Sequence, residues 1–407
     1  MVAHSEPKLG DAGRARDRRK WGTSMKLFLG ARAFSVLTLL AFMGIAGGAG
    51  SSALAASNAC AAKAGLPPRA HHFGGIVGAR SVDLGCVNTD NAAVGDPPLI
   101  WHNGPVMGTN TTGPVVVTPI FWHPAGHPMA TGYENLISRY LSDVAHDSGK
   151  HTNVFSTLTE YFGTDGTINY QVREGTPIND TNPLPTDGCI LNNKDTTGIY
   201  ADGSGYDSCI DDAQVQAETA SVVKANNLTV NLSHIYVLFV PKHVETCFLP
   251  GSTSSLKQNN QACTINHEKS AGYCAYHTMA PNRMVYANLS YPIYHSPLQT
   301  VAFTCGSDAH SAFGTIQSPN GNVDADVEIS PTSHEIMEAI TDPDVSTGWY
   351  DAAGYENGDE CAYVYGTPQG VSGQFYNQVI NHDHYLTQEE FSNNDFLNTG
   401  LGCLQSN

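Results

Sequence analysis

The sequence predicts an α/β (α+β) fold, in which a mixed β-sheet is flanked by helices and stapled by disulfides. Short apolar segments of strand length alternate with longer segments of helical period along the chain. The 407 residues are 41% hydrophobic and only 14% charged, so the chain can bury a large core. We find no internal repeat.

The predicted elements follow from runs of apolar residues between turn residues. The first strand, 114–122, is almost wholly apolar, as in a strand that is buried on both faces. A segment rich in Gly, Asp and Asn at 163–205 reads as an insertion, and 241–283 reads mainly as cysteine-linked loops. The predicted strands are 114–122, 234–240, 284–288 and 300–304, and the predicted helices are 133–147, 153–162 and 211–226.

The first 55 residues read as a secretory leader. Basic residues precede an apolar run at 33–46, and Ala53-Leu54-Ala55 provides a cleavage site, which predicts a secreted, extracellular protein without a transmembrane anchor after cleavage. Residues 56–98 read as an extended N-terminal segment and 99–407 as the folded domain.

The charge of the chain excludes one class of partner. The leader holds eight of the 20 basic residues but three of the 38 acidic ones, so the mature protein is even more acidic than the net −18 of the whole chain. Such a surface repels phosphate backbones and anionic lipids, and we expect no nucleic-acid binding.

Ten cysteines lie beyond the cleavage site, and an even number in an exported chain predicts disulfides. Closure of short loops suggests three of the pairs, and two more would staple longer segments. There is no C-x-x-C pair, which argues against a zinc site made of cysteines. The suggested pairs are Cys60 with Cys86, Cys189 with Cys209, Cys247 with Cys263, Cys274 with Cys305, and Cys361 with Cys403.

A candidate metal site begins at His334. His334, Glu335 and Glu338 form an H-E-x-x-E motif on a predicted helix, so residues 334 and 338 project from the same face. The related H-E-x-x-H motif of zincins supplies two zinc ligands and a general-base glutamate. The residues at 330–333, Ser-Pro-Thr-Ser, predict that the helix begins there.

A third ligand is expected in the acidic segment at 348–361. Glu356 and Asp359 are the leading candidates, and spacing alone does not choose between them. A Cys361–Cys403 disulfide would tie this segment to the C-terminal tail. Because carboxylate ligands loosen the preference for zinc, Ca²⁺ is the alternative ion.

The chain also resembles a known family. The runs S-H-E-I-M-E-A-I-T-D-P, G-W-Y-D and G-D-E-C are similar to motifs of the phosphate-induced protein 1 (EXORDIUM-like) family, whose members have a zincin-like core. Further similarities are the strand that ends in Ile-Phe-Trp, the C-A-Y-H element at 274–277 and the segment that begins at Tyr376, so the resemblance spans roughly 100–404. It implies a zincin-like sheet, His334 and Glu338 as metal ligands, Glu335 as base, and Glu356 or Asp359 completing the site.

Three other groups carry weaker signals. His277 lies in the family-like element, where a structural role is favoured over one in the site. Asp324, Asp326 and Glu328 alternate as on the solvent face of a strand. The segment 202–212 has the composition of a calcium-binding loop but lacks the full EF-hand pattern. The segment 381–385 either supplies a side chain that stabilises an oxyanion or is a solvated loop.

These observations predict an exported metal-dependent hydrolase, similar to a zinc peptidase, that acts on a peptide or protein substrate. The first alternative is a non-catalytic EXORDIUM-like extracellular or cell-wall protein with a structural or vestigial metal site. The second is a structural protein stabilised by calcium.

Overall fold

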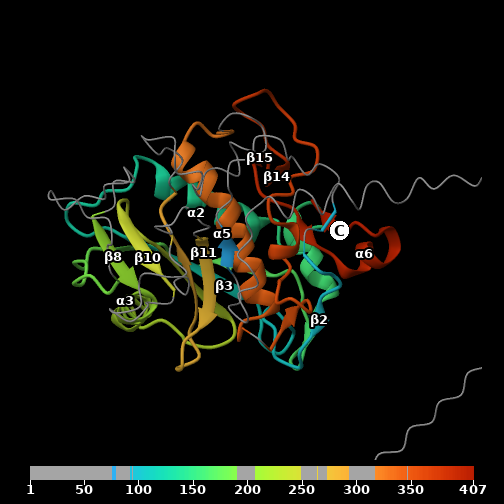
Figure 1. Ribbon diagram of the computed structural model, residues 1–407, viewed down its shortest axis with the longest axis horizontal. Helices are drawn as coiled ribbons and strands as arrows, with labels where there is room; N and C mark the ends of the chain where they lie inside the picture. The colour runs from blue at the N-terminus through green and yellow to red at the C-terminus, as the bar shows by residue number, and fades with distance from the viewer. Residues whose placement is uncertain are drawn as a thin grey trace, which may run out of the picture. The chain divides into compact units, whose positions relative to one another are not determined.

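A mixed, seven-stranded β-sheet forms the centre of the computed structural model (Figure 1). Its strand order is β1-β11-β12-β9-β3-β6, with β7 also paired to β3. Strands β12, β9, β3, β6 and β7 are parallel, whereas β11 is antiparallel to both β12 and β1. The strands are β1 (Ile76–Gly78), β3 (Val115–Trp122), β6 (Val172–Glu174), β7 (Ile178–Asp180), β9 (His234–Phe239), β11 (Tyr273–Met279) and β12 (Val285–Leu289).

The structure describes residues 76–78, 92–93, 95–189, 207–248, 264, 273–292, 317–345 and 347–407. All of them belong to one compact unit, Ala49–Asn407. The predicted leader (1–55), most of the predicted N-terminal segment and the predicted strand at 300–304 lie outside these residues. Among the helices of the described ranges, none is both long and apolar enough to cross a membrane.

Alternation along the strands divides the core between the two faces of the sheet. Val117 and Phe121 of β3 join Val237 of β9 in the larger cluster, whereas Ile120 and Leu238 join a smaller one on the opposite face. Helices α2 (Tyr133–His146) and α5 (Val323–Thr341) contribute to the larger cluster, and α3 (Asp212–Ala225) contributes to the smaller. The mixed α/β architecture predicted from the sequence is therefore confirmed.

Most of the predicted elements form close to their expected bounds. The strands β3, β9 and β12 and the helices α2 and α3 begin and end within a few residues of the predictions. The expected helix at 153–162 is a 3-10 helix, η1 (Val154–Glu160), whose N-cap Asn153 accepts a hydrogen bond from the backbone N–H of Phe155. Of the predicted calcium-like segment 202–212, residues 202–206 lie outside the described residues, whereas 208–211 form a strand and residue 212 begins α3.

Two expectations about loops were wrong. The segment 163–205 contains β6 and β7, and the cysteine-rich region contains β11, which is central to the site. Strands this short, or flanked by cysteines and glycines, give little periodic signal. The remaining elements are β2 (Ile100–Trp101), β4 (Phe162–Gly163), β5 (Gly166–Thr167), β8 (Ser208–Asp211), β10 (Val244–Cys247), β13 (Trp349–Tyr350), η2 (Asp359–Cys361), β14 (Gln378–Ile380), β15 (Asp383–Tyr385), β16 (Glu390–Phe391), α6 (Asn393–Thr399) and β17 (Cys403–Leu404).

Helix α5 begins about ten residues earlier than its sequence predicts. Its N-cap is Asn322, whose side chain accepts a hydrogen bond from the N–H of Ala325, and Pro331 lies inside the helix instead of in its first turn. The helix crosses the sheet (Figure 1) and contacts α2 and the strands β11, β12 and β1. Its residues from Asp324 to Thr341 are buried. A pattern with proline and hydroxyl residues thus mimics a helix start within a longer helix.

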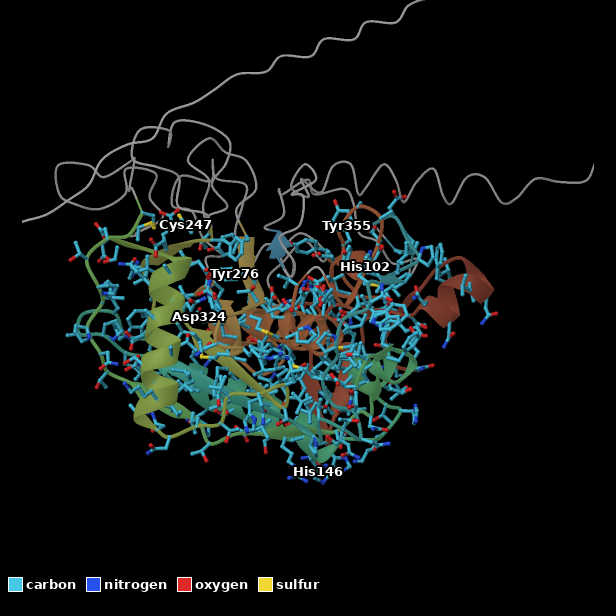
Figure 2. All side chains as sticks on the ribbon, turned by 90° about the horizontal axis from the view of Figure 1, so that it is seen from below. His102, His146, Cys247, Tyr276, Asp324 and Tyr355 are labelled. Carbon is cyan, nitrogen blue, oxygen red and sulfur yellow. A yellow bond between two sulfur atoms is a disulfide. The ribbon has the colours of Figure 1, made fainter. Side chains whose placement is uncertain are left out.

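The acidic residues in the first turns of α5 are buried. The prediction that Asp324, Asp326 and Glu328 line the solvent face of a strand is therefore wrong. Tyr291 donates a hydrogen bond to Asp324, and Ser318 donates one to Asp326 at 2.5 Å. Asp324 accordingly lies within the packed side chains of the domain (Figure 2).

Two of the predicted disulfides fall within the described residues and form. Cys189 pairs with Cys209, and Cys361 pairs with Cys403. Cys247 and Cys274 are also disulfide-bonded, but their predicted partners, Cys263 and Cys305, lie outside the described residues, as does the predicted pair of Cys60 and Cys86.

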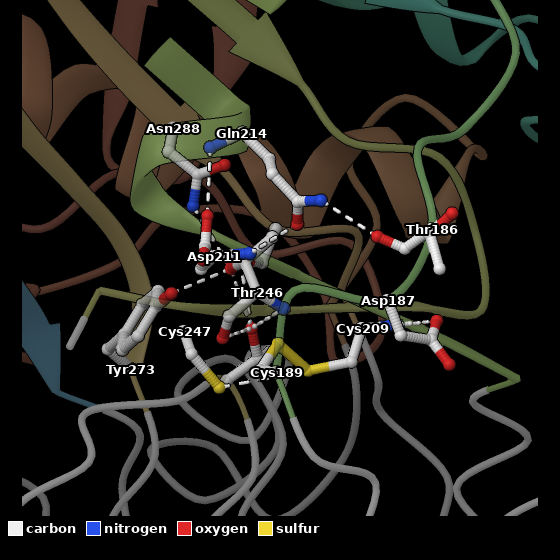
Figure 3. Close-up of a disulfide and its surroundings, with 12 residues drawn as sticks. Thr186, Asp187, Cys189, Cys209, Asp211, Gln214, Thr246, Cys247, Tyr273 and Asn288 are labelled. Carbon is white, nitrogen blue, oxygen red and sulfur yellow. Dashed lines mark hydrogen bonds between the residues drawn. A yellow bond between two sulfur atoms is a disulfide. The ribbon is translucent and has the colours of Figure 1, made fainter. Parts of the chain in front are cut away.

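The Cys189–Cys209 disulfide lies at the start of α3. Figure 3 shows it beside Asp211 and Gln214, which form a capping box at the N-terminus of that helix. The Sγ atoms of Cys209 and Cys247 are 3.8 Å apart, so β8 and β10 are held together beneath the helix.

The assigned N-cap of α5 can be tested directly. We expect Asn322→Ala to lower the free energy of unfolding by about 1 kcal/mol, because the N–H of Ala325 loses its acceptor. Asn322→Ser keeps a capping oxygen and should lose less. Urea denaturation monitored by circular dichroism measures both, and equal midpoints for the two variants would contradict the assignment.

Candidate metal centre

Helix α5 supplies three residues of the site. His334, Glu335 and Glu338 are each fully buried. The Nε2 atom of His334 lies 2.9 Å from Oε1 of Glu338, as expected for residues four apart on one helix face. The geometric expectation for the H-E-x-x-E motif therefore holds.

Asp359 is the third member of this group. Its Oδ1 is 3.7 Å from Nε2 of His334, and its backbone N–H donates a hydrogen bond to Oε1 of Glu338 at 3.0 Å. One ligand atom from each of His334, Glu338 and Asp359 lies within 4.8 Å of the other two, a spacing that can hold a metal ion.

Glu356 lies on the other side of the site. Its Oε1 is 3.7 Å from Nε2 of His277, a residue of β11. Of the two third-ligand candidates, Asp359 is therefore the one grouped with His334 and Glu338. Glu356 faces the sheet instead.

His277 belongs to the site, which the sequence signal did not favour. Its Nδ1 is 3.2 Å from Oε2 of Glu335 and 3.6 Å from Oε2 of Glu338, and the three residues form a second group that could hold a metal. The C-A-Y-H resemblance was the only sequence signal for it. Its position opposite α5 depends on the pairing of β11 with β12, in which His277 lies opposite Ala287.

The loop that carries Glu356 and Asp359 is held from several directions. Gln388 donates a hydrogen bond from its side chain to the carbonyl oxygen of Gly358 at 2.7 Å, and Thr341 of α5 donates one to the side chain of Asn357. The Cys361–Cys403 disulfide closes the far end of the loop, so the predicted brace is present.

Gly358 packs directly against the imidazole of His334. A Cβ atom at this position would lie 2.6 Å from Nδ1 of His334. The backbone there has ordinary helical angles, φ −72° and ψ −43°, so it is close approach to the ring that favours glycine. The sequence Gly-Asp-Glu-Cys thus places Asp359 beside His334.

Burial and crowding raise the proton affinity of the acidic groups. The pKa of Glu356 is raised well above its usual value by burial and by the nearby charge of Glu338, and the pKa of Asp359 is raised by the same two causes. Although burial opposes it, the pKa of His334 is also raised, because Glu338, Glu335 and Asp359 surround the ring.

The donor set fits a divalent cation. In the described part of the chain, the ion-pair contacts of Glu338, Glu356 and Asp359 are with histidines, and none is with lysine or arginine. Both ring nitrogens of His334, Oε2 of Glu338 and both carboxylate oxygens of Glu356 are buried without a hydrogen-bond partner. Polar atoms of this kind are costly to bury unless a cation or a proton neutralises them.

Tyr385 and Glu390 belong to neither of the two groups that could hold a metal. Tyr385, from the segment 381–385, donates a hydrogen bond to Asp143 and accepts one from Arg139, both on α2. Its hydroxyl group therefore binds α2 and is not the oxyanion-stabilising group that this segment could have supplied. Glu390, which sequence analysis did not select, is fully buried, and its pKa is raised by burial. No signal marked Glu390, since β16 is only two residues long.

Comparisons of the chain with protein-family models, with curated proteins and with solved structures find no match.

A single methyl group should disturb the site. We expect Gly358→Ala to push the loop off the ring of His334, because the added carbon needs space that the imidazole occupies. The expected result is a zinc affinity reduced about 10-fold or more, the range seen when groups that orient metal ligands are altered. Isothermal titration with zinc measures this, and an affinity equal to that of the unchanged protein would contradict the proposed contact.

The metal-free protein should lose stability as pH rises. His334, Glu356 and Asp359 have raised pKa values in the folded state, so the folded chain binds more protons than the unfolded chain and its free energy of unfolding falls with increasing pH. Burial lowers the pKa of His277, so this residue makes the free energy of unfolding rise with pH below its usual pKa of 6.5. Above that pH, only the groups with raised pKa values contribute, and the free energy of unfolding should fall.

Thermal melting in a chelator, from about pH 6.5 upward, tests this sign. Saturating zinc should flatten the dependence, because a cation replaces the protons. A melting temperature that rises with pH in the chelator would contradict the assignment.

Proposed function

We propose that the chain is an exported metal-dependent hydrolase, similar to a zinc peptidase, whose site is built on the H-E-x-x-E helix of a zincin-like fold. The observation that carries this proposal is the buried group of His334, Glu338 and Asp359, whose ligand atoms lie within 4.8 Å of one another. A secretory leader and several disulfides are consistent with an exported enzyme.

The metal would be held by His334 Nε2 and by carboxylate oxygens of Glu338 and Asp359. A set of one imidazole and two carboxylates suits zinc, with manganese or calcium as weaker candidates. When bound, the ion supplies Lewis acidity, which polarises a carbonyl and makes water easier to deprotonate.

Glu335 is the general base in this proposal. Its side chain is fully buried, and its Oε2 lies 3.2 Å from Nδ1 of His277, the atom that also lies 3.6 Å from Oε2 of Glu338. It would accept a proton from water and pass it to the leaving amine of a peptide. Nδ1 of His277 lies 3.2 Å from Oε2 of this carboxylate.

A second function is favoured by the extent of burial. His334, Glu335 and Glu338 have no exposed surface, which suits a metal ion that stabilises the fold. The alternative is thus a non-catalytic, EXORDIUM-like extracellular protein with a structural metal site. Hydrolysis of a peptide library separates the two functions, since the alternative predicts no cleavage with or without zinc.

The role of Glu335 gives a sharp test of the hydrolase. We expect Glu335→Gln to reduce kcat on a cleaved peptide about 10²–10⁴-fold while zinc at His334 is retained, because the amide cannot accept the proton. His334→Ala should lose that zinc as well as the activity. Elemental analysis and peptide kinetics on the same preparations measure both quantities.

The control is His151→Ala, which alters an exposed histidine outside the site. Glu335→Gln with full activity would refute the proposed base, and zinc retained in full by His334→Ala would refute the proposed ligands.

A further inference from the structure

The orientation of the His277 ring identifies its protonated nitrogen. Nε2 lies 3.1 Å from the backbone carbonyl oxygen of Asp342, which can only accept a hydrogen bond, so Nε2 carries the hydrogen. Histidines that bind metals usually donate their remote N–H to a carbonyl or carboxylate and coordinate through the other nitrogen. His277 has this arrangement, with Nδ1 as the remaining nitrogen.

Nδ1 of His277 faces two carboxylates. It lies 3.2 Å from Oε2 of Glu335 and 3.6 Å from Oε2 of Glu338, and all three side chains are fully buried. In the neutral ring, Nδ1 presents a lone pair to these oxygens. Electron-rich atoms this close in a buried space require a positive group among them, which is either a proton or a cation.

Glu338 presents one oxygen to each side. Oε1 lies 2.9 Å from His334 and accepts the N–H of Asp359, whereas Oε2 lies toward His277 and has no hydrogen-bond partner. A carboxylate placed in this way can bridge two cations. Sites that hold two metals are common in hydrolases.

The charge of the cluster also exceeds what one ion neutralises. A divalent ion at His334 balances the two carboxylates of Glu338 and Asp359. Glu356 and Glu390 lie in the same buried region. A second cation would lower the cost of burying them.

We propose that His277, Glu335 and Glu338 form a second divalent-cation site, which shares Glu338 with the site of His334 and Asp359. The proposal rests on the proposed function, because the two sites have one ligand in common. It also has a consequence for the reaction. A second ion engages the carboxylate of Glu335, so zinc beyond the first equivalent should inhibit hydrolysis.

The test is zinc stoichiometry of the full chain by elemental analysis after equilibration with Zn²⁺ alone. The unchanged protein should hold two zinc ions per chain and His277→Gln one. Glutamine can keep the hydrogen bond to the Asp342 carbonyl but has no ring nitrogen at the Nδ1 position. His334→Ala should also hold one, and His151→Ala two. Loading with Mn²⁺ adds a spectroscopic readout, because two bridged ions give a spin-coupled electron paramagnetic resonance signal and one ion does not.

The outcomes separate the two proposals. One zinc in both the unchanged protein and His277→Gln would overturn the second site, place a proton between His277 and Glu335, and leave the proposed function standing. No zinc in the unchanged protein would overturn both. If His277→Gln does not fold, as judged by circular dichroism, Glu335→Gln replaces it: one zinc in that variant supports the second site, and two zinc ions refute it.

Discussion

The structure depends on how it compensates the buried carboxylates that surround α5. Charged groups of one sign are rarely buried together, because each loses its hydration and repels the others. In the described residues, the ion-pair contacts of Glu338, Glu356 and Asp359 are with two histidines, His277 and His334, and burial lowers the pKa of His277. The pKa values of Glu356, Asp359 and His334 are raised because negative charge in this buried region exceeds positive charge. In the proposed site, a divalent cation would neutralise several of these carboxylates at once.

The surrounding fold is arranged to hold these charges in fixed positions. Strand β11 brings His277 to the face of the sheet that α5 covers, and the Cys361–Cys403 disulfide closes the loop that carries Asp359. Gly358 allows that loop to lie against the ring of His334. Distant parts of the sequence therefore converge on one short stretch of helix. Side chains held this firmly lose little entropy when an ion binds.

The sequence predicted which residues belong to this site better than it predicted the elements that position them. Because H-E-x-x-E is a local pattern, it placed His334 and Glu338 on one helix face correctly. The predicted start of that helix was wrong for two reasons. Pro331 is flanked by serine and threonine residues, a pattern typical of a helix N-terminus. The observed N-cap, Asn322, precedes acidic residues that alternate as in a strand. Alternation failed as a guide because Asp324 and Asp326 find hydrogen-bond donors in the interior. Tyr291, the donor to Asp324, is 33 residues away in the sequence, so no local pattern indicates this contact.

The choice between Glu356 and Asp359 shows the same limit. Both lie at plausible distances along the chain, and only the turn at Gly358 separates them, so that Asp359 reaches His334 and Glu356 faces His277. The contribution of β11 could not be read from a local pattern either, because His277 meets Glu335, a residue 58 positions away in the sequence.

Glu338 is where the chain departs from the two-histidine zincin pattern, and its geometry gives that departure a physical meaning. An imidazole at this position would offer one lone pair to one ion, and its second nitrogen would need an acceptor. A carboxylate has two oxygen atoms that point in different directions. In Glu338, Oε1 lies near His334 and Oε2 lies near His277. In the proposed metal site, a glutamate at this position would weaken the preference for zinc and reduce the acidifying power of the ion. It also joins the helix, the acidic loop and the sheet through one side chain, which a histidine at 338 would not do.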